Sequence, residues 1–190
     1  MTITPTPFEG VFAITPTYHK DERGYFTETY RLEVLEQQLG HALHFVQDNE
    51  SLSRQGVIRG LHYQLPPFAQ SKLVRVLQGT VWDVIVDLRK DSPTFGQYYA
   101  ETLSAENRRQ LFIPRGFAHG YITLSETAIF SYKVDHYYAK AHEASIAFDD
   151  PKLAIPWPLT PQEWILSAKD RNHPPFAEAP HFKSIKSCYD

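Results

Sequence analysis

The chain is poor in cysteine and has no long apolar run. Among its 190 residues the one cysteine is Cys188, which cannot form an internal disulfide, so a reducing compartment is the default. No stretch approaches the roughly 20 apolar residues of a membrane span. Residues 1–10 also lack the basic and apolar regions of a secretory leader. These absences predict a cytoplasmic protein that does not enter a membrane.

The chain also has no large excess of positive or negative charge. The 19 basic and 22 acidic residues leave a formal net charge of −3 at pH 7. A chain with this balance has no basic field that would attract nucleic acid or an anionic membrane surface. A small anionic ligand is still compatible with it, because such a ligand needs only a few local Arg and Lys side chains.

Aromatic residues and proline are abundant, whereas glycine is modest. Aromatics make up 14% of the chain, and there are 14 Pro against 9 Gly. With few helical runs, this composition favours a β-rich fold. No repeat or interdomain linker is visible, so we expect one domain over residues 1–190. Its C-terminal part, from about residue 171, carries no recognisable motif, and the last fifteen residues predict a loosely held tail.

One helix and a series of short strands are predicted. Leu32, Leu35 and Leu39 recur at helical spacing over residues 31–39, and Gly40 follows as a stop signal. Runs of β-branched and aromatic residues between turn residues predict strands at 57–64, 72–77, 81–89, 98–103, 110–113, 121–124 and 127–136. Many short strands at this spacing are typical of a β-barrel or sandwich.

Three residues on these strands place a polar group in an unusual setting. His62 lies in a crowded polar stretch, Lys72 is in phase with apolar residues, and Tyr132 projects with the apolar set of its strand. Each also has a structural interpretation. The histidine could be a core residue bonded to a carbonyl, the lysine could extend its amine to water, and the tyrosine could pack in the core. Strand parity alone leaves both interpretations open.

The segment FIPRGFAHGYITL at 112–124 resembles the second motif of the cupin superfamily, in which a tight turn presents a histidine, here His119. A cupin's first motif usually carries two histidines two apart, but His62 is followed two residues on by Gln64, and Lys72 lies downstream where a glutamate is usual. A borderline divalent metal needs at least three N, O or S ligands, which His62 and His119 alone do not supply. We therefore expect a mainly β, cupin-type antiparallel barrel or jelly roll with a few short helices and no metal.

Longer blocks resemble the dTDP-4-dehydrorhamnose 3,5-epimerase family, in the family's order and from about Phe8 to Asp170. They are DERGYFTE at 21–28, FVQDNESLSRQGVIRGLHYQ at 45–64, AQSKLVRVLQG at 69–79, WDVIVDLRKDSPTFGQ at 82–97, IPRGFAHGYITLSE at 113–126 and LSAKD at 166–170. The resemblance implies an isomerase of dTDP-rhamnose biosynthesis. It would convert dTDP-4-dehydro-6-deoxy-D-glucose to dTDP-4-dehydro-L-rhamnose by removing and returning protons at C3 and C5, with no cofactor.

The resemblance also implies the roles of particular residues. His62 would be the general base, held by Asp170, and Tyr132 on the opposite side would be the general acid. Lys72 would stabilise the negative charge that develops on O4. Arg59 and Arg23 would contact the pyrophosphate, and Tyr138 would stack on the thymine. Further ligand contacts are implied for Phe26, Glu28, Gln47, Asn49, His119, Glu143 and Lys169. In this family the N-terminal strands cross to a second subunit, so Arg23, Phe26 and Glu28 would complete the partner's site in a homodimer.

Four alternatives remain open at this point. The nearest is an epimerase that inverts only C3 or only C5 of a related dTDP-4-keto-deoxysugar, with the same base and acid. A second is a metal-free 3,4-ketoisomerase of the same superfamily. A third is a non-catalytic sugar or nucleotide binding module, and a fourth is a metal-dependent dioxygenase or isomerase. The presence of His62, Asp170, Tyr132 and Lys72 together favours an enzyme over a binding module.

Overall fold

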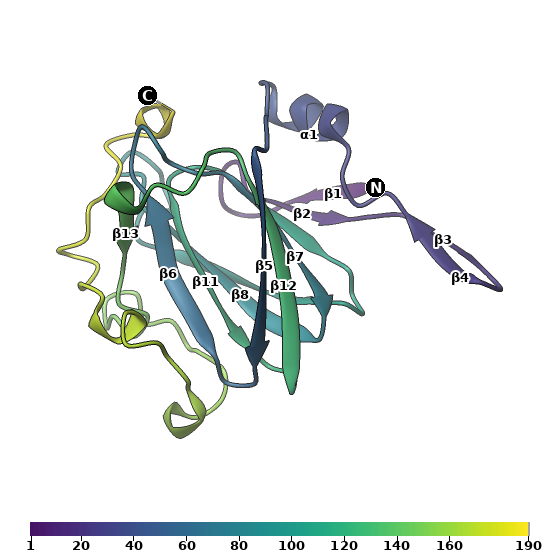
Figure 1. Ribbon diagram of the computed structural model, residues 1–190. Coiled ribbons are helices and arrows are strands. Elements are labelled where there is room, and N and C mark those ends of the chain that lie inside the picture. The colour runs from purple at the N-terminus through teal and green to yellow at the C-terminus, as the bar shows by residue number, and fades with distance from the viewer. Residues whose placement is uncertain (190) are drawn as a thin grey trace.

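Two antiparallel sheets face each other in the computed structural model, which describes residues 1–189 (Figure 1). The six-stranded sheet has the order β1 (Thr2–Pro5), β2 (Phe12–Thr15), β10 (Gln110–Ile113), β7 (Lys72–Gln78), β12 (Thr127–Val134) and β5 (Gln47–Arg54). The five-stranded sheet has the order β13 (Glu143–Ser145), β6 (Ile58–Gln64), β11 (Phe117–Thr123), β8 (Thr80–Asp87) and β9 (Tyr98–Ser104). The prediction of a mainly β, antiparallel barrel is confirmed.

A separate hairpin and a few short helices complete the described chain. The hairpin consists of β3 (Tyr18–Asp21) and β4 (Gly24–Thr27) and projects away from the two sheets (Figure 1). The α-helix is α1 (Leu32–Leu39), and the 3-10 turns are η1 (Lys140–His142), η2 (Pro161–Glu163), η3 (Asp170–Asn172) and η4 (Lys186–Cys188). None of these helices is long and apolar enough to cross a membrane.

The predicted helix is confirmed, together with its end. Leu35 is buried against the outer face of the six-stranded sheet, with Ile14 and Phe112. Gly40 has a φ of 73°, in the left-handed region that glycine adopts without a steric penalty, and its N–H donates to the Glu36 carbonyl at 2.8 Å. The turn residue therefore ends the helix where the sequence indicates.

Apolar side chains form three layers because successive strand residues point to opposite faces. One cluster fills the space between the sheets and includes Val74, Ile85 and Phe130. A second lies on the outer face of the five-stranded sheet, and the third lies beneath α1.

The C-terminal segment corrects one prediction. Phe176, Phe182 and Cys188 are buried in the cluster on the outer face of the five-stranded sheet, and the segment runs along that sheet (Figure 1). The backbone of Phe182 also bonds to Leu88 and Lys90. The prediction of a loosely held tail is wrong for residues 176–189, because a few apolar residues among many polar ones are enough to anchor the segment.

Strand β5 was not among the predicted strands. Its sequence, Gln47–Arg54, is almost entirely polar and carries no β-branched residue. It pairs with β12 over its whole length, from Gln47 opposite Val134 to Arg54 opposite Thr127. Backbone pairing at the edge of the sheet, and not side-chain burial, makes this segment a strand.

Candidate active site

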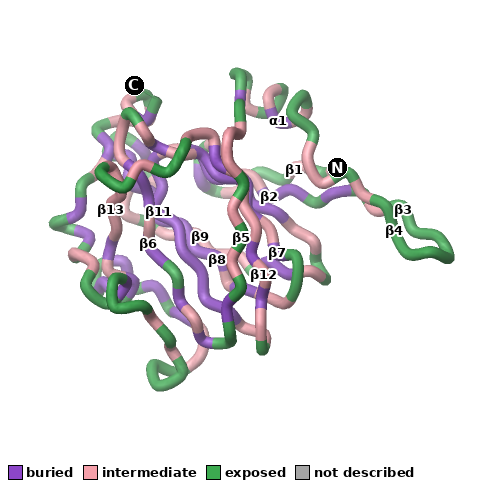
Figure 2. Tube along the Cα trace, viewed as in Figure 1, coloured by how far each residue is buried: buried purple, intermediate pink, exposed green. Residues whose placement is uncertain are grey.

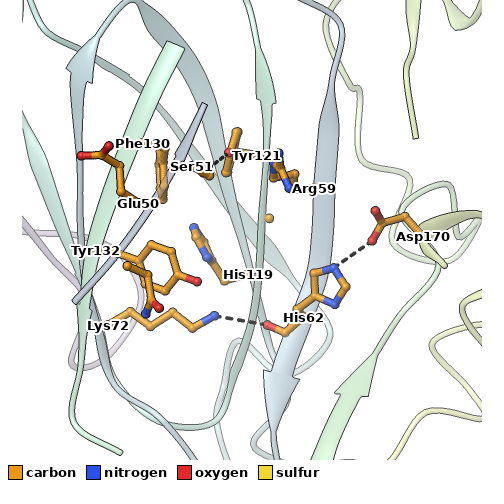
Figure 3. A pocket seen from close by; sticks show the side chains of 12 residues that line it. Glu50, Ser51, Arg59, His62, Lys72, His119, Tyr121, Phe130, Tyr132 and Asp170 are labelled. Atoms are coloured by element: carbon orange, nitrogen blue, oxygen red, sulfur yellow. Dashed lines mark hydrogen bonds and ion pairs between the residues drawn. The ribbon is translucent and has the colours of Figure 1, made fainter. Parts of the chain in front are cut away.

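A cavity of about 300 Å³ opens between the two sheets at their polar end (Figure 3). Residues of β5, β7 and β12 line one side of it, and residues of β6 and β11 line the other. Seven of the predicted site residues lie here, namely Asn49, Arg59, His62, Lys72, His119, Tyr132 and Asp170. Glu50, Ser51, Gly120, Tyr121 and Phe130 complete the lining.

Strand pairing brings the site's histidines to one place. His62 on β6 and His119 on β11 are Cα partners in the antiparallel register. The two strands approach closely here, because a Cβ added to Gly60 would lie 2.5 Å from the Gly120 Cα. Glycine at both positions lets the strands pack at this distance. Residues 57 positions apart in the sequence thus share one cavity wall.

His62 is held from behind by Asp170 of the turn η3. The His62 Nε2 and the Asp170 Oδ1 are 2.8 Å apart, and the Ser167 hydroxyl donates to Asp170 Oδ2 at 2.6 Å. Burial alone would raise the pKa of the Asp170 carboxyl, but the hydrogen bonds from His62 and Ser167 outweigh it and lower the pKa to about 2. Asp170 is therefore a carboxylate at neutral pH and fixes His62 with Nε2 as the donor.

A second carboxylate lies on the other side of the same imidazole. The Oε1 of Glu143 is 3.8 Å from the His62 Nδ1, an atom without a hydrogen-bond partner. Burial raises the pKa of Glu143, but hydrogen bonds from Lys169, at 2.6 Å, and from the Tyr138 hydroxyl, at 2.9 Å, outweigh it and lower the pKa. An imidazolium formed at His62 would lie between two negative charges.

Glu143 also begins a chain of contacts along the rim of the cavity. The backbone N–H of Tyr138 donates to the Gln47 side-chain oxygen at 3.2 Å, and Gln47 in turn donates to Asn49 at 2.8 Å. Tyr138 itself is more than half exposed. The predicted ligand contacts Gln47, Asn49, Tyr138, Glu143 and Lys169 thus form one connected row, although they come from distant segments.

Lys72 is buried on the inner face of β7, with 8% of the residue exposed. Its Nζ lies 3.5 Å from the His62 carbonyl oxygen, and Figure 3 shows the amine passing below Tyr132 toward this oxygen. Burial lowers the pKa of Lys72 to about 8, although Asp83 and Glu143 act in the opposite direction. The amine is therefore mostly protonated at pH 7 and mostly neutral at pH 9.

His119 forms a second histidine–aspartate pair, which the sequence did not predict. Its Nε2 is 2.8 Å from Asp83 Oδ2, and Asp83 is fully buried. Burial lowers the pKa of His119, so the ring is neutral at pH 7. The sequence does contain a signal for this pair, because Asp83 lies between Trp82 and Val84 in a mostly apolar strand. An acidic residue in a strand that is buried on both faces needs a partner.

Tyr132 faces His62 across the cavity from strand β12 (Figure 3). Burial raises the pKa of its hydroxyl, the neighbouring Tyr121 adds to this, and Arg59 acts against it. Arg59 is held by a bond from its Nε to the Ser53 hydroxyl at 3.0 Å. Tyr132 is therefore protonated at neutral pH, and its strand neighbours Ala128, Phe130 and Val134 are buried as the strand parity predicted.

Three predicted site residues do not lie at this cavity. Arg23 is paired with Asp21, and Glu28 is paired with Arg31 at 2.8 Å. Phe26, on the projecting hairpin, is 71% exposed, and Figure 2 shows most of that hairpin in the colour of exposed residues. Within one subunit these three residues are thus separate from the cavity.

Comparison with known proteins assigns the chain to a family. A family model described as dTDP-4-dehydrorhamnose 3,5-epimerase matches residues 5–178. The chain belongs to this family. It is accordingly an enzyme, an isomerase that epimerises a carbohydrate, and the resemblance stated from the sequence blocks is confirmed. A curated member from Pseudomonas aeruginosa is 50% identical over 96% of this chain and 99% of its own length.

Solved structures of the 3,5-epimerase family also match the fold. The enzyme from Elizabethkingia anophelis has a TM-score of 0.91 and 51% identity, covering 94% of this chain and 97% of the other. A dTDP-6-deoxy-D-glucose-3,5-epimerase from Legionella pneumophila, in complex with dTDP-4-keto-L-rhamnose, has a TM-score of 0.90 and 45% identity over 96% and 99% of the two chains. The cupin-type architecture expected from the sequence is therefore confirmed.

Proposed function

We propose that His62 is the general base and Tyr132 the general acid in the epimerisation of dTDP-4-dehydro-6-deoxy-D-glucose at C3 and C5. Both carbons are adjacent to the C4 carbonyl, so loss of a proton from either gives an enolate. With Nε2 donating to Asp170, the Nδ1 of His62 carries the lone pair that accepts this proton. Tyr132 then returns a proton to the opposite face of the same carbon.

The enolate oxygen is the place where negative charge develops. The buried Lys72 amine is the cation that can meet it, because a fixed charge away from bulk water interacts strongly and needs no reorganisation. After each inversion His62 carries an extra proton and Tyr132 has lost one. Exchange with solvent restores both groups before the next carbon is inverted.

The rest of the cavity binds the nucleotide. Arg59 offers a forked pair of donors to the pyrophosphate, and the exposed ring of Tyr138 is available to stack on the thymine. Gln47, Asn49, His119, Glu143 and Lys169 supply the remaining polar contacts. The observation that carries the proposal is the cavity in which a base with a carboxylate behind it faces a protonated tyrosine across a buried cation.

Solvent deuterium separates the two-carbon reaction from its closest alternative. In D2O we expect deuterium at both C3 and C5 of the dTDP-linked sugar, because each inversion returns a proton drawn from solvent. The measurement is mass spectrometry or proton NMR of the nucleotide sugar during turnover.

Other labelling patterns would contradict the proposed reaction. Label at one carbon alone would show an epimerase specific for C3 or C5. A product with its carbonyl at C3 would show a ketoisomerase instead. A useful control is the same incubation without enzyme, which corrects for spontaneous exchange next to the ketone.

We further propose a homodimer in which the hairpin β3–β4 reaches the partner's cavity. The hairpin makes no strand pair with either sheet and leaves Tyr25 and Phe26 exposed, an apolar surface that a second subunit would cover. Arg23 and Glu28 flank it and would add polar contacts to the partner's substrate. The cytoplasm is the proposed location, on the sequence grounds given above.

Mixed dimers test whether the hairpin acts on the partner subunit. Arg23→Ala and His62→Asn should each be nearly inactive alone. Co-expressed with separate affinity tags, they should regain about one quarter of wild-type turnover, because half of the dimers would then carry one intact site. If Arg23 served its own subunit's cavity, every site in the mixture would lack one residue, and no activity would return.

A further inference from the structure

A second buried imidazole packs against the His62–Asp170 pair. His173 lies three residues after Asp170, its side chain is 3% exposed, and its ring is perpendicular to that of His62 with centroids 5.0 Å apart. Neither ring nitrogen of His173 forms a well-directed hydrogen bond, although the Ile146 backbone lies close enough to the ring to act on its pKa. Burial of an imidazole without hydrogen bonds is unfavourable, and the proposed epimerisation gives this residue no task.

The donor atoms of His62, Asp170 and His173 have the separations of a metal-ligand set. All three lie within 4.8 Å of one another. From Asp170 Oδ1 the distances are 2.8 Å to the His62 Nε2 and 3.7 Å to the His173 Nε2. Ligand atoms around a tetrahedral zinc ion lie about 3.4 Å apart, given metal–ligand bonds of about 2.1 Å. The two observed distances bracket that value, so small side-chain movements would suffice.

The surroundings of these three residues suit a bound cation. Ser167 donates to Asp170 Oδ2 and leaves Oδ1 facing the two imidazoles. If the His62 Nε2 bound a metal, its proton would move to Nδ1, where Glu143 Oε1 lies 3.8 Å away. A carboxylate behind a metal-binding histidine orients the ring and fixes its tautomer. Two nitrogens and one carboxylate are donors that borderline divalent ions prefer.

We propose that His62, Asp170 and His173 form a binding site for a borderline divalent transition-metal ion, with Zn²⁺ as the best fit, and that the bound ion inhibits the enzyme. The ion would occupy Nε2 while the proton of the neutral ring moves to Nδ1. The imidazole would then have no lone pair to accept a proton from the sugar. This site differs from the cupin pair His62 and His119, because the His119 Nε2 is bonded to Asp83. Binding depends on the three residues alone, whereas inhibition rests on the proposed role of His62.

Zinc titration of matched variants tests the site. By calorimetry and dialysis we expect one Zn²⁺ per chain in the wild type and a loss of affinity of at least about tenfold in His173→Phe. The control is His181→Phe, which replaces another, partly buried histidine of the same segment, packed between Phe95 and Phe176. It should bind zinc as the wild type does, and Mg²⁺, which prefers oxygen ligands, should bind to none of them. His173→Gln provides a smaller replacement if the phenylalanine variant does not fold.

Turnover measured in the same samples tests inhibition. Zn²⁺ should inhibit the wild type and His181→Phe, with full recovery on chelation, and the turnover that remains in His173→Phe should resist zinc. Equal zinc affinity in the wild type and both His173 variants, or no binding at all, would overturn the site. Binding that depends on His173 but leaves turnover unchanged would uphold the site, and would overturn the inhibition together with the role of His62 as base.

Discussion

Replacement of His62 by Asn should lower kcat by about 10⁴-fold, which is the upper range for loss of general base catalysis. Asparagine has no nitrogen that can take a proton near neutral pH, and its shorter amide ends near the position of Nδ1, so the contact that the His62 Nε2 makes with Asp170 is lost as well. The dyad contact of 2.8 Å places His62 at the centre of the proposed chemistry. Turnover is measured by coupled assay or by loss of the C5 proton signal in NMR.

Binding measurements separate this loss from damage to the site. The dissociation constant of dTDP should change less than tenfold, because the nucleotide contacts proposed for Arg59 and Tyr138 do not involve His62. His41→Asn, at an exposed histidine next to the end of α1, is the matched control and should retain full activity. If His62→Asn kept more than a few per cent of wild-type turnover, another residue would have to be the base.

Replacement of Lys72 by Met should lower turnover and raise stability at the same time. Removal of the cation that meets the enolate oxygen is expected to reduce kcat by about 10²–10³-fold, as loss of one preorganised donor does elsewhere. The free energy of unfolding should rise by about 1–3 kcal/mol at pH 7, because a charged amine is no longer buried. Few single substitutions combine these two effects, and together they identify a residue kept for function.

The pH dependence of stability gives a second test of Lys72. The pKa of Lys72 is about 8 in the folded chain and 10.5 for an ordinary lysine in water, so between these values the unfolded chain binds more protons than the folded one. The free energy of unfolding contributed by this group therefore rises with pH from about 8 to 10.5, by about 3 kcal/mol in total. Below pH 8 the full cost of the buried charge is present.

Urea denaturation at several pH values measures this contribution. The wild type should show the rising contribution between pH 8 and 10.5, and Lys72→Met should lack it. Lys133→Met is the control, because this lysine forms an exposed pair with Asp48 and its loss removes no buried charge. Parallel pH curves for the wild type and Lys72→Met would show that the pKa of Lys72 is not lowered in the folded chain.

Strand periodicity and composition determined much of the fold in advance. Alternation of apolar residues predicted most central strands of both sheets, and the helix at 31–39 was fixed by three leucines and a glycine. The same alternation placed Lys72 and Tyr132 on inward faces, where the structure has them. These features depend on neighbours in the sequence, so a reader of the sequence can find them.

Strand pairing and chain path decided the rest, because they join residues that the sequence keeps apart. Edge pairing with β12 makes the polar segment 47–54 a strand, and the apolar anchors Phe176 and Phe182 fix a segment that composition alone suggests is loose. Asp170 was assigned to His62 only through family resemblance. The two residues are 108 positions apart in the sequence, and the fold brings the His62 Nε2 to 2.8 Å from the Asp170 Oδ1. Burial lowers the pKa of Lys72 and of His119, and this desolvation depends on three-dimensional surroundings that no sequence pattern encodes.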